Sequence, residues 1–269
     1  MRPEIGSNPV ITLTTDFGVE DPYVGLMKAV ILSIAPDVRI VDLTHGIRSH
    51  DVMEAAMVIR SSYSYFPKGA IHVVVVDPGV GSHRRPLLVT NEYGYFVAPD
   101  NGVLSDICGG SSQVDCRELT AAQFLHHPVS NTFHGRDVFA PVSAWISRGV
   151  DPDQFGSLVH KMVNLDLPEV RQLTRNSLLG TVLRVDKFGN LITNLRSEKY
   201  QNLLQSGKFK LNIGDHQIYQ LCRSYHEARG HEPFVIWGSF DLLEISCNQS
   251  SATRYLKAGA HDEFEIYFE

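Results

Sequence analysis

The chain has 269 residues, 43% of them hydrophobic and 20% charged, which is ordinary globular usage and allows one large domain or two smaller ones. A net charge of -6, with no basic cluster longer than Arg84-Arg85, argues against nucleic acid as a partner. The four cysteines lack C-x-x-C spacing, the start lacks a signal-peptide profile, and no apolar run reaches the roughly 18 residues that span a bilayer, so we expect a cytoplasmic protein without membrane contact.

Strand and helix signals alternate from the beginning of the chain. Residues 10–15 are a short β-branched run, and Asp21-Pro22 supplies an N-cap and a first-turn proline for the amphipathic helix that follows. Residues 39–44 repeat the strand signal. Asp51, followed by Glu54, resembles a capping box and predicts a second helix.

A third strand signal lies at residues 71–76, which are continuously apolar, as expected for a strand covered on both faces. Shorter strand signals follow at residues 93–99 and 113–119, and a helical stretch is expected near Val138–Arg148. These alternations predict an N-terminal α/β domain, residues 1–165, with a largely parallel central sheet flanked by helices.

The second half of the chain changes character. Residues 166–177 are polar, contain a proline and show weak periodicity, so we interpret them as a linker. From residue 178 to residue 269 the sequence predicts short strands between Gly, Asn and Asp turns. The strand signals are LLGTVLRVD, NLITNL, KFKLNI, HQIYQL, PFVIWG, LLEIS and DEFEIYF. They predict a smaller C-terminal domain that resembles a β-barrel or a sandwich.

Acidic residues follow the predicted parallel strands. Asp16, the stretch Asp42–His45 and Asp77 all lie at or near strand ends, and the carboxyl edge of an open α/β sheet is where ligands bind. No glycine-rich phosphate loop follows the first strand. Carboxylates there suit a sugar diol or a cationic ligand. Asp77-Pro-Gly could equally be a simple turn, although the glycines and Arg84-Arg85 that follow favour a site.

Two further segments combine polar and aromatic residues. His134 lies in SNTFHGRD, where Asp137 is placed to cap the next helix, and an ordinary packed or surface histidine is the alternative interpretation. Residues 186–190, DKFGN, join an acid, an aromatic, a glycine and an amide, and a hairpin turn is the alternative there. Metal-ligand spacings are absent from the sequence, so we expect no metal site.

Several motifs in this order resemble the S-adenosyl-L-methionine (SAM) hydroxide adenosyltransferase family, the SAM hydrolases related to fluorinases and chlorinases. The resemblance runs from about Val10 to the end of the chain. Its motifs are LTTDFG (13–18), PYVG (22–25), VDLTHGI (41–47), DPGVGSHRR (77–85), PDNG (99–102), TFHGRD (132–137), DKFGN (186–190) and GSFDLLEISCNQSS (238–251).

The resemblance implies a reaction and an assembly. The reaction is in-line (SN2) attack of water or hydroxide on C5' of SAM, which gives adenosine and L-methionine and requires no cofactor because SAM is the substrate. The assembly is a homotrimer, with each active site between the N-terminal domain of one subunit and the C-terminal domain of its neighbour.

The resemblance also implies the site residues. Asp77, Arg84 and His134 fall on the family's catalytic Asp-Arg-His set, with Arg84 rather than Arg85 in the matching position, and which of the three accepts the proton stays open. The implied substrate-binding residues are Asp16 at the ribose and, around methionine and adenine, Asp186, Phe188, Asn190, Tyr225, Ser239 and Asn248.

Two alternative functions would also involve SAM but would not hydrolyse it. A chlorinase-like halogenase would use a halide at the same carbon, but the halogenating relatives replace the acid of the DPG motif with an aromatic residue, and they carry Tyr-Ser where this chain has His134-Gly135. A non-catalytic SAM- or adenosine-binding protein would need no Asp-Arg-His set. Formation of adenosine from SAM separates the enzyme from the binding protein.

Overall fold

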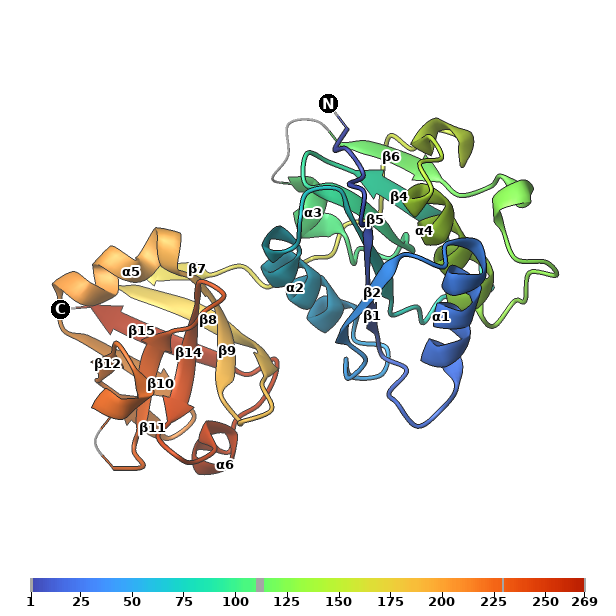
Figure 1. Cartoon of the computed structure of the whole chain (residues 1–269). Coiled ribbons are helices and arrows are strands. Elements are labelled where there is room, and N and C mark those ends of the chain that lie inside the picture. The colour runs from blue at the N-terminus through green and yellow to red at the C-terminus, as the bar shows by residue number, and fades with distance from the viewer. Residues whose placement is uncertain (1, 110–113, 229, 269) are drawn as a thin grey trace. The chain divides into compact units, whose positions relative to one another are not determined.

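The computed structural model describes residues 2–109, 114–228 and 230–268 and divides into two compact units, Met1–Leu165 and Asp166–Glu269 (Figure 1). The segment interpreted as a linker, residues 166–177, contains strand β7 (Arg171–Thr174), which pairs antiparallel with β8 (Ser177–Val185). The polar composition of this segment concealed an exposed edge strand, all four residues of which face solvent.

The first unit contains a six-stranded sheet in the order β2-β1-β3-β5-β4-β6. The pairs β1–β2, β1–β3 and β3–β5 are parallel, and β4 pairs antiparallel with both β5 and β6, so the predicted largely parallel sheet is confirmed. The strands are β1 (Val10–Thr15), β2 (Arg39–Thr44), β3 (Ala70–Val75), β4 (Pro86–Thr90), β5 (Gly94–Pro99) and β6 (Asp115–Glu118).

Helices cover both faces of this sheet (Figure 1). One hydrophobic cluster joins α1 and α4 to one face, and a second joins α2 and α3 to the other. Strand β3 lies between the two clusters and is buried along its whole length, as predicted, including its one polar residue, His72. The helices are α1 (Tyr23–Ile34), α2 (Val52–Ser62), α3 (Ser105–Gly109) and α4 (Ala140–Ser147), the last preceded by a π-helical turn at Gly135–Phe139.

The two predicted helix starts had different outcomes. Asp51 caps α2 as expected, because its Oδ1 accepts the backbone N–H of Glu54 at 2.8 Å. The N-cap position of α1 is Pro22, which has no side-chain acceptor, so the predicted cap by Asp21 is wrong. Asp21 stands one residue before the cap position.

The second unit contains a nine-stranded sheet in the order β11-β10-β15-β8-β9-β14-β13-β12, with β7 added at β8. Its strands curl around one hydrophobic cluster, in agreement with the predicted barrel-like domain. Besides β7 and β8, the strands are β9 (Leu191–Arg196), β10 (Phe209–Ile213), β11 (His216–Ile218), β12 (Leu221–Cys222), β13 (Pro233–Trp237), β14 (Leu242–Cys247) and β15 (Glu263–Phe268).

Two helices of this unit, α5 (Ser197–Ser206) and α6 (Ala252–Leu256), were not anticipated by the β-rich pattern. In α5, Tyr200 and Leu204 are buried one helical turn apart, and most other positions are exposed. So short an apolar stripe gives a weak periodic signal. Across the described ranges, no helix has the length and apolar content needed to cross a bilayer.

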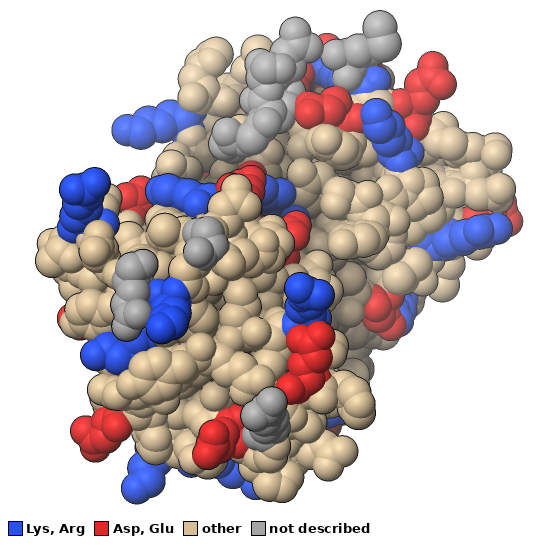
Figure 2. All heavy atoms as spheres, turned by 90° about the vertical axis from the view of Figure 1, so that its left-hand side faces the viewer, with Lys and Arg blue, Asp and Glu red and all other residues tan. Residues whose placement is uncertain are grey.

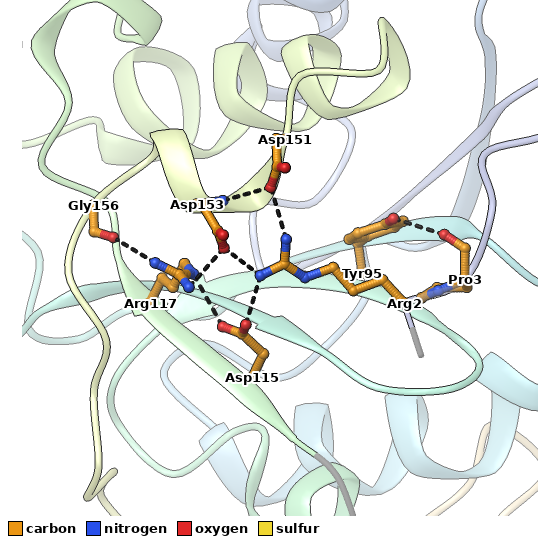
Figure 3. Close-up of polar contacts among 8 residues, drawn as sticks. All are labelled: Arg2, Pro3, Tyr95, Asp115, Arg117, Asp151, Asp153 and Gly156. Carbon is orange, nitrogen blue, oxygen red and sulfur yellow. Dashed lines mark hydrogen bonds and ion pairs between the residues drawn. The ribbon is translucent and has the colours of Figure 1, made fainter.

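The N-terminal segment is held on the first unit by an ion-pair network around Arg2 (Figure 3). The guanidinium of Arg2 donates to Asp151 and to Asp115, each at 2.7 Å, and it also contacts Asp153. Arg117 shares two of these carboxylates, at 3.1 Å from Asp115 and 2.6 Å from Asp153. Because Asp115 and Arg117 lie on the edge strand β6, the network ties the chain terminus to that edge.

We expect Arg2→Ala to lower the melting temperature by about 2–4 °C at low salt, since losing a shared ion network of this kind costs about 1 kcal/mol. The difference should shrink in 1 M salt, where exposed charges are screened. Arg171→Ala is the control, because Arg171 makes an isolated and exposed pair with Glu263. Equal thermal shifts for the two variants, or a salt-independent shift for Arg2→Ala, would contradict the network's role.

Candidate active site

The two acids that follow β1 and β3 lie at the same edge of the sheet. Thr15 at the end of β1 pairs in parallel register with Val75 at the end of β3; Asp16 follows Thr15 directly, and Asp77 lies two residues beyond Val75. This is the carboxyl edge, where open α/β sheets bind ligands. The placement expected for the two acids is the one that the structure has.

Asp77, Arg84 and His134 form one hydrogen-bonded unit. The Arg84 Nε atom donates to both carboxylate oxygens of Asp77 at 3.0 Å, and Nη2 donates to Oδ2 at 2.5 Å. The same Nη2 lies 2.6 Å from His134 Nδ1. Both charged side chains are buried, with 5% of Asp77 and 8% of Arg84 exposed. A bidentate pair of this kind fixes the plane of the guanidinium.

The loops that carry these residues pack closely against each other. Gly81 has a φ of +75°, and a Cβ atom there would lie 2.2 Å from the carbonyl oxygen of Asn131, so glycine is required for both its conformation and its space. Asn131 belongs to the loop that leads to His134. The neighbouring Arg85 points elsewhere and pairs with Asp100 at 2.5 Å, which agrees with the choice of Arg84 for the trio.

The hydrogen bond from Arg84 determines the state of the histidine. Arginine has only donors, so His134 Nδ1 must accept, and the neutral ring then carries its hydrogen on Nε2. Burial, together with the positive charge of Arg84, lowers the pKa of His134 below its ordinary value, although Asp77 acts in the opposite direction. The structure therefore favours a neutral imidazole at neutral pH.

One hydrogen-bond donor of Arg84 is used neither by Asp77 nor by His134. The Nη1 atom of Arg84 is buried and has no hydrogen-bond partner within the described residues. A buried guanidinium N–H without an acceptor is costly, so such a group indicates a place for an oxygen atom of a ligand or a water molecule. The ring of Phe139 lies against the guanidinium, 5.4 Å from its central carbon to the ring centroid.

Asp137 does not cap the helix after His134. It is fully buried inside the π-helical turn, where it pairs with Arg136 at 2.6 Å and accepts the backbone N–H of Ser130 at 2.8 Å. The N-cap position is His134, which makes no side-chain cap bond. The predicted capping role of Asp137 is therefore wrong, and its carboxylate instead joins the start of this turn to the preceding loop.

In the second unit, residues 186–190 form the hairpin turn between β8 and β9, where Val185 pairs with Leu191. Asp186 shapes the turn, because its carboxylate accepts the backbone N–H groups of Phe188 and Asn190 at 2.8 and 2.9 Å and the Asn190 amide at 2.8 Å. The hairpin interpretation is thus correct as a description of structure. The Phe188 ring is 76% exposed and projects from the turn.

Tyr225 extends this cluster. Its hydroxyl lies 3.5 Å from the Asn190 side-chain amide and donates to Glu244 Oε2 at 2.9 Å. Burial, together with the hydrogen bond to Glu244, raises the pKa of Tyr225 to about 12, so its hydroxyl stays protonated. The sequence interpretation missed Glu244, which is 7% exposed; its signal was an acid inside the apolar run LLEIS.

The remaining two candidates lie apart from each other. Ser239 is in the turn before β14, and Asn248 directly follows that strand, so they stand at opposite ends of it. The backbone carbonyl of Asn248 accepts from His231 Nδ1 at 2.9 Å. No hydrogen bond between described residues joins either side chain to Asp186, Asn190 or Tyr225.

Charges of both signs are interspersed on the face drawn in Figure 2, which carries no continuous basic field. Within residues 2–109, 114–228 and 230–268, no group of three or more His, Cys, Asp or Glu side chains is arranged to hold a metal ion.

The chain matches one family along both units. Residues 11–156 match the SAM hydroxide adenosyltransferase N-terminal domain, and residues 180–265 match the C-terminal domain of the same name. A Salinispora arenicola protein named (R)-S-adenosyl-L-methionine hydrolase is 40% identical over 97% of this chain and 99% of its own. A Nocardia brasiliensis protein named fluorinase is 25% identical over 77% of this chain and 78% of its own.

A solved structure shares the fold. It belongs to a Thermotoga maritima protein described only as uncharacterized and conserved, has a TM-score of 0.89 and 31% identity, and covers 96% of this chain and 99% of its own. The chain therefore belongs to the SAM hydroxide adenosyltransferase family.

Proposed function

We propose that the chain is a SAM hydrolase, which transfers the 5'-adenosyl group of SAM to water and yields adenosine, L-methionine and one proton. The observation that carries the proposal is the buried unit of Asp77, Arg84 and His134 with its spare Arg84 N–H. Family membership and the hydrolase names of relatives support the same reaction. SAM itself is the substrate, and the proposal includes no cofactor.

The chemistry needs little more than a well-placed nucleophile. The sulfonium leaves as a neutral thioether, which requires no general acid. Holding water in line behind C5' can supply a large part of the roughly 7–11 kcal/mol available from oriented proximity. Arg84 Nη1 donates to the oxygen of that water, and the guanidinium charge favours hydroxide character as the carbon–oxygen bond forms. Asp77 and His134 hold the guanidinium in place.

The other candidates hold the substrate. Asp16 accepts from the ribose hydroxyls, and Asp186 meets the methionine ammonium. Phe188 and Tyr225 present exposed aromatic rings, which suit a planar base. Asn190, Ser239 and Asn248 supply polar contacts around methionine and adenine. Because these groups are divided between the two units, we propose a cytoplasmic homotrimer in which each site joins the N-terminal unit of one subunit to the C-terminal unit of its neighbour.

Halogenation is the alternative, because a fluorinase is also similar to this chain. The buried carboxylate of Asp77 opposes it, since a negative charge next to the nucleophile raises the cost of placing a halide there. The same carboxylate is compatible with water, which carries no charge.

The test is turnover of SAM in ¹⁸O-labelled water with chloride present, followed by mass spectrometry of the nucleoside. We expect the label at the 5'-oxygen of adenosine. A 5'-chloro nucleoside would establish the halogenase instead, and bound but unreacted SAM would establish a binding protein. The sulfonium is a stereocentre, so both sulfur epimers should be supplied; relatives are named for the R form, and we propose that this epimer reacts faster.

The state of His134 predicts the acid side of the pH profile. Because the pKa of His134 is lowered, the neutral ring that accepts from Arg84 is present at neutral pH and is lost only as the pH falls below about 6.5, the ordinary histidine value. We expect kcat to hold near neutral pH and to decline with an apparent pKa below that value. His134→Gln should abolish this decline. An acid decline centred above pH 7 in the wild type would contradict the assignment.

A further inference from the structure

A buried threonine–histidine pair lies directly behind Asp16. Thr15 Oγ1 and His45 Nδ1 are 2.9 Å apart, and the two residues are 0% and 8% exposed. The register of β1 and β2 brings them together: Leu13 pairs with Asp42, but the next pair is Thr14 with Thr44. Residue 43 is therefore an extra residue of β2, and such a bulge re-aims the side chains that follow it.

The neighbours of His45 indicate where its ring hydrogen lies. His45 Nε2 lies 3.0 Å from Asp42 Oδ1 without hydrogen-bond geometry, and Lys28 donates to Asp42 Oδ2 at 2.6 Å. Burial opposes the charge on Asp42, but Lys28 and His45 lower its pKa, so the carboxylate is ionised. A negative charge this close to Nε2 favours the tautomer that carries its hydrogen there, and in that tautomer Nδ1 accepts from the Thr15 hydroxyl.

The same two residues hold the loop that carries Asp16. The Thr15 hydroxyl oxygen accepts the backbone N–H of Phe17 at 3.2 Å, and the carbonyl of His45 accepts that of Gly18 at 2.9 Å. Asp16 therefore follows Thr15 directly and precedes two backbone N–H groups, of Phe17 and Gly18, that the Thr15–His45 pair holds.

The side chain of Asp16 is fixed only in part. Its Oδ2 accepts the backbone N–H of His50 at 2.9 Å. Its Oδ1 has no hydrogen-bond partner in the part of the chain that the structure describes. One carboxylate oxygen is thus held by the protein, and the other is available to a ligand.

We propose that Thr15 and His45 are positioning residues, which set the orientation of Asp16 and thereby the affinity for the ribose hydroxyls of the substrate. The inference rests on the proposed function, since it gives Asp16 the ribose. Neither residue touches the substrate; both act through the loop at residues 16–18. Lys28 and Asp42 complete the array by fixing the tautomer of His45.

The chain contains a matched control for this pair. On the same strand, Thr12 Oγ1 lies 2.9 Å from Nδ1 of His72, and both residues are buried, at 0% and 1% exposed. This second pair joins β1 to β3 in the middle of the sheet, away from the strand ends. Removing either threonine hydroxyl leaves one buried histidine nitrogen without its hydrogen-bond partner, so the stability losses should be similar.

The experiment compares Thr15→Val with Thr12→Val in the full-length protein. Binding of adenosine is measured by calorimetry, and stability by thermal unfolding. We expect Thr15→Val to raise the adenosine Kd about tenfold, a change equivalent to one net hydrogen bond, and Thr12→Val to change it less than about twofold. In turnover of SAM, Thr15→Val should raise KM with kcat nearly unchanged, as loss of uniform binding does.

Equal Kd values for the two variants, or an unchanged Kd for Thr15→Val, would overturn the proposal. If Thr15→Val does not fold, Thr15→Ser and Thr15→Ala form a second pair that differs only in the hydroxyl, and the serine variant should bind about tenfold more tightly than the alanine variant. Equal affinity in this pair would also refute the proposal.

A double-mutant cycle tests whether the effect passes through Asp16. In an Asp16→Ala background, adding Thr15→Val should cause no further loss of adenosine affinity, whereas additive losses would refute the mechanism. Failure of the proposed function has a different signature. A wild-type protein that binds adenosine but never forms it from SAM would refute hydrolysis and leave the Thr15 comparison valid, and a wild-type protein that does not bind adenosine would overturn both.

Discussion

We expect Asp77→Asn to slow hydrolysis of SAM by about 10²–10⁴-fold, the range typical of losing a positioned charged or proton-accepting group, and to leave the Kd for SAM nearly unchanged. The reason is local. An asparagine keeps the size of the side chain but cannot accept from Arg84 with two charged oxygens, so the guanidinium loses its fixed plane and its compensating charge. Single-turnover rates and calorimetric binding measure the two quantities separately.

The control is Asp100→Asn. Asp100 pairs with Arg85, the neighbour of Arg84, at 2.5 Å, and it is as buried as Asp77, with 4% of its side chain exposed. It therefore reports what breaking a similar ion pair costs the fold without touching the trio. Comparable losses of rate in both variants would show that Asp77 acts on stability alone.

Arg84→Met should have an effect of similar size. It removes the donor at Nη1 and leaves Asp77 buried without its partner, so we expect kcat to fall by about 10²–10³-fold or more. Arg84→Lys keeps the charge but not the planar fork, and it should recover only part of the rate. Stopped-flow or quenched turnover of SAM measures both variants.

Arg84→Met also leaves the buried carboxylate of Asp77 without its partner, which lowers the stability of the fold. Thermal unfolding of this variant is therefore measured together with its turnover rate. Arg85→Met is the matched variant, since it breaks the neighbouring pair with Asp100. A rate near that of the wild type in Arg84→Met, or an equal loss in Arg85→Met, would remove Arg84 from the reaction.

The parallel strands of the first unit were predictable from apolar or β-branched residues. Residues 10–15 and 71–76 gave this signal because strands covered by helices on both faces are largely buried. Residues 39–44 gave it through Ile40, Val41 and Thr44, although β2 is an edge strand with no buried residue. Strand β4 follows a charged loop and is short, so the same signal was too brief to detect. Helix α5 shows its amphipathic character only in two buried residues.

The site was predictable as a set of residue types but not as a geometry. The motifs identified Asp77, Arg84 and His134, yet the assignment of Arg84 over Arg85 came from the family pattern and not from residue chemistry. The contact of Thr15 with His45 depends on a bulge that spacing does not reveal. Asp137 was misjudged because burial and its pair with the partly exposed Arg136 outweighed its local preference for a helix start.

The contacts within the Asp77–Arg84–His134 trio are confined to the first unit, whereas the Asp186–Asn190–Tyr225 chain of hydrogen bonds is confined to the second. Under the proposed roles, the choice of attacking species is encoded in the first half of the gene alone, whereas binding of the nucleoside is shared, because Asp16 also lies in the first unit. A chimera that combines halves from a hydrolase and a fluorinase should therefore take its nucleophile from the donor of the first half.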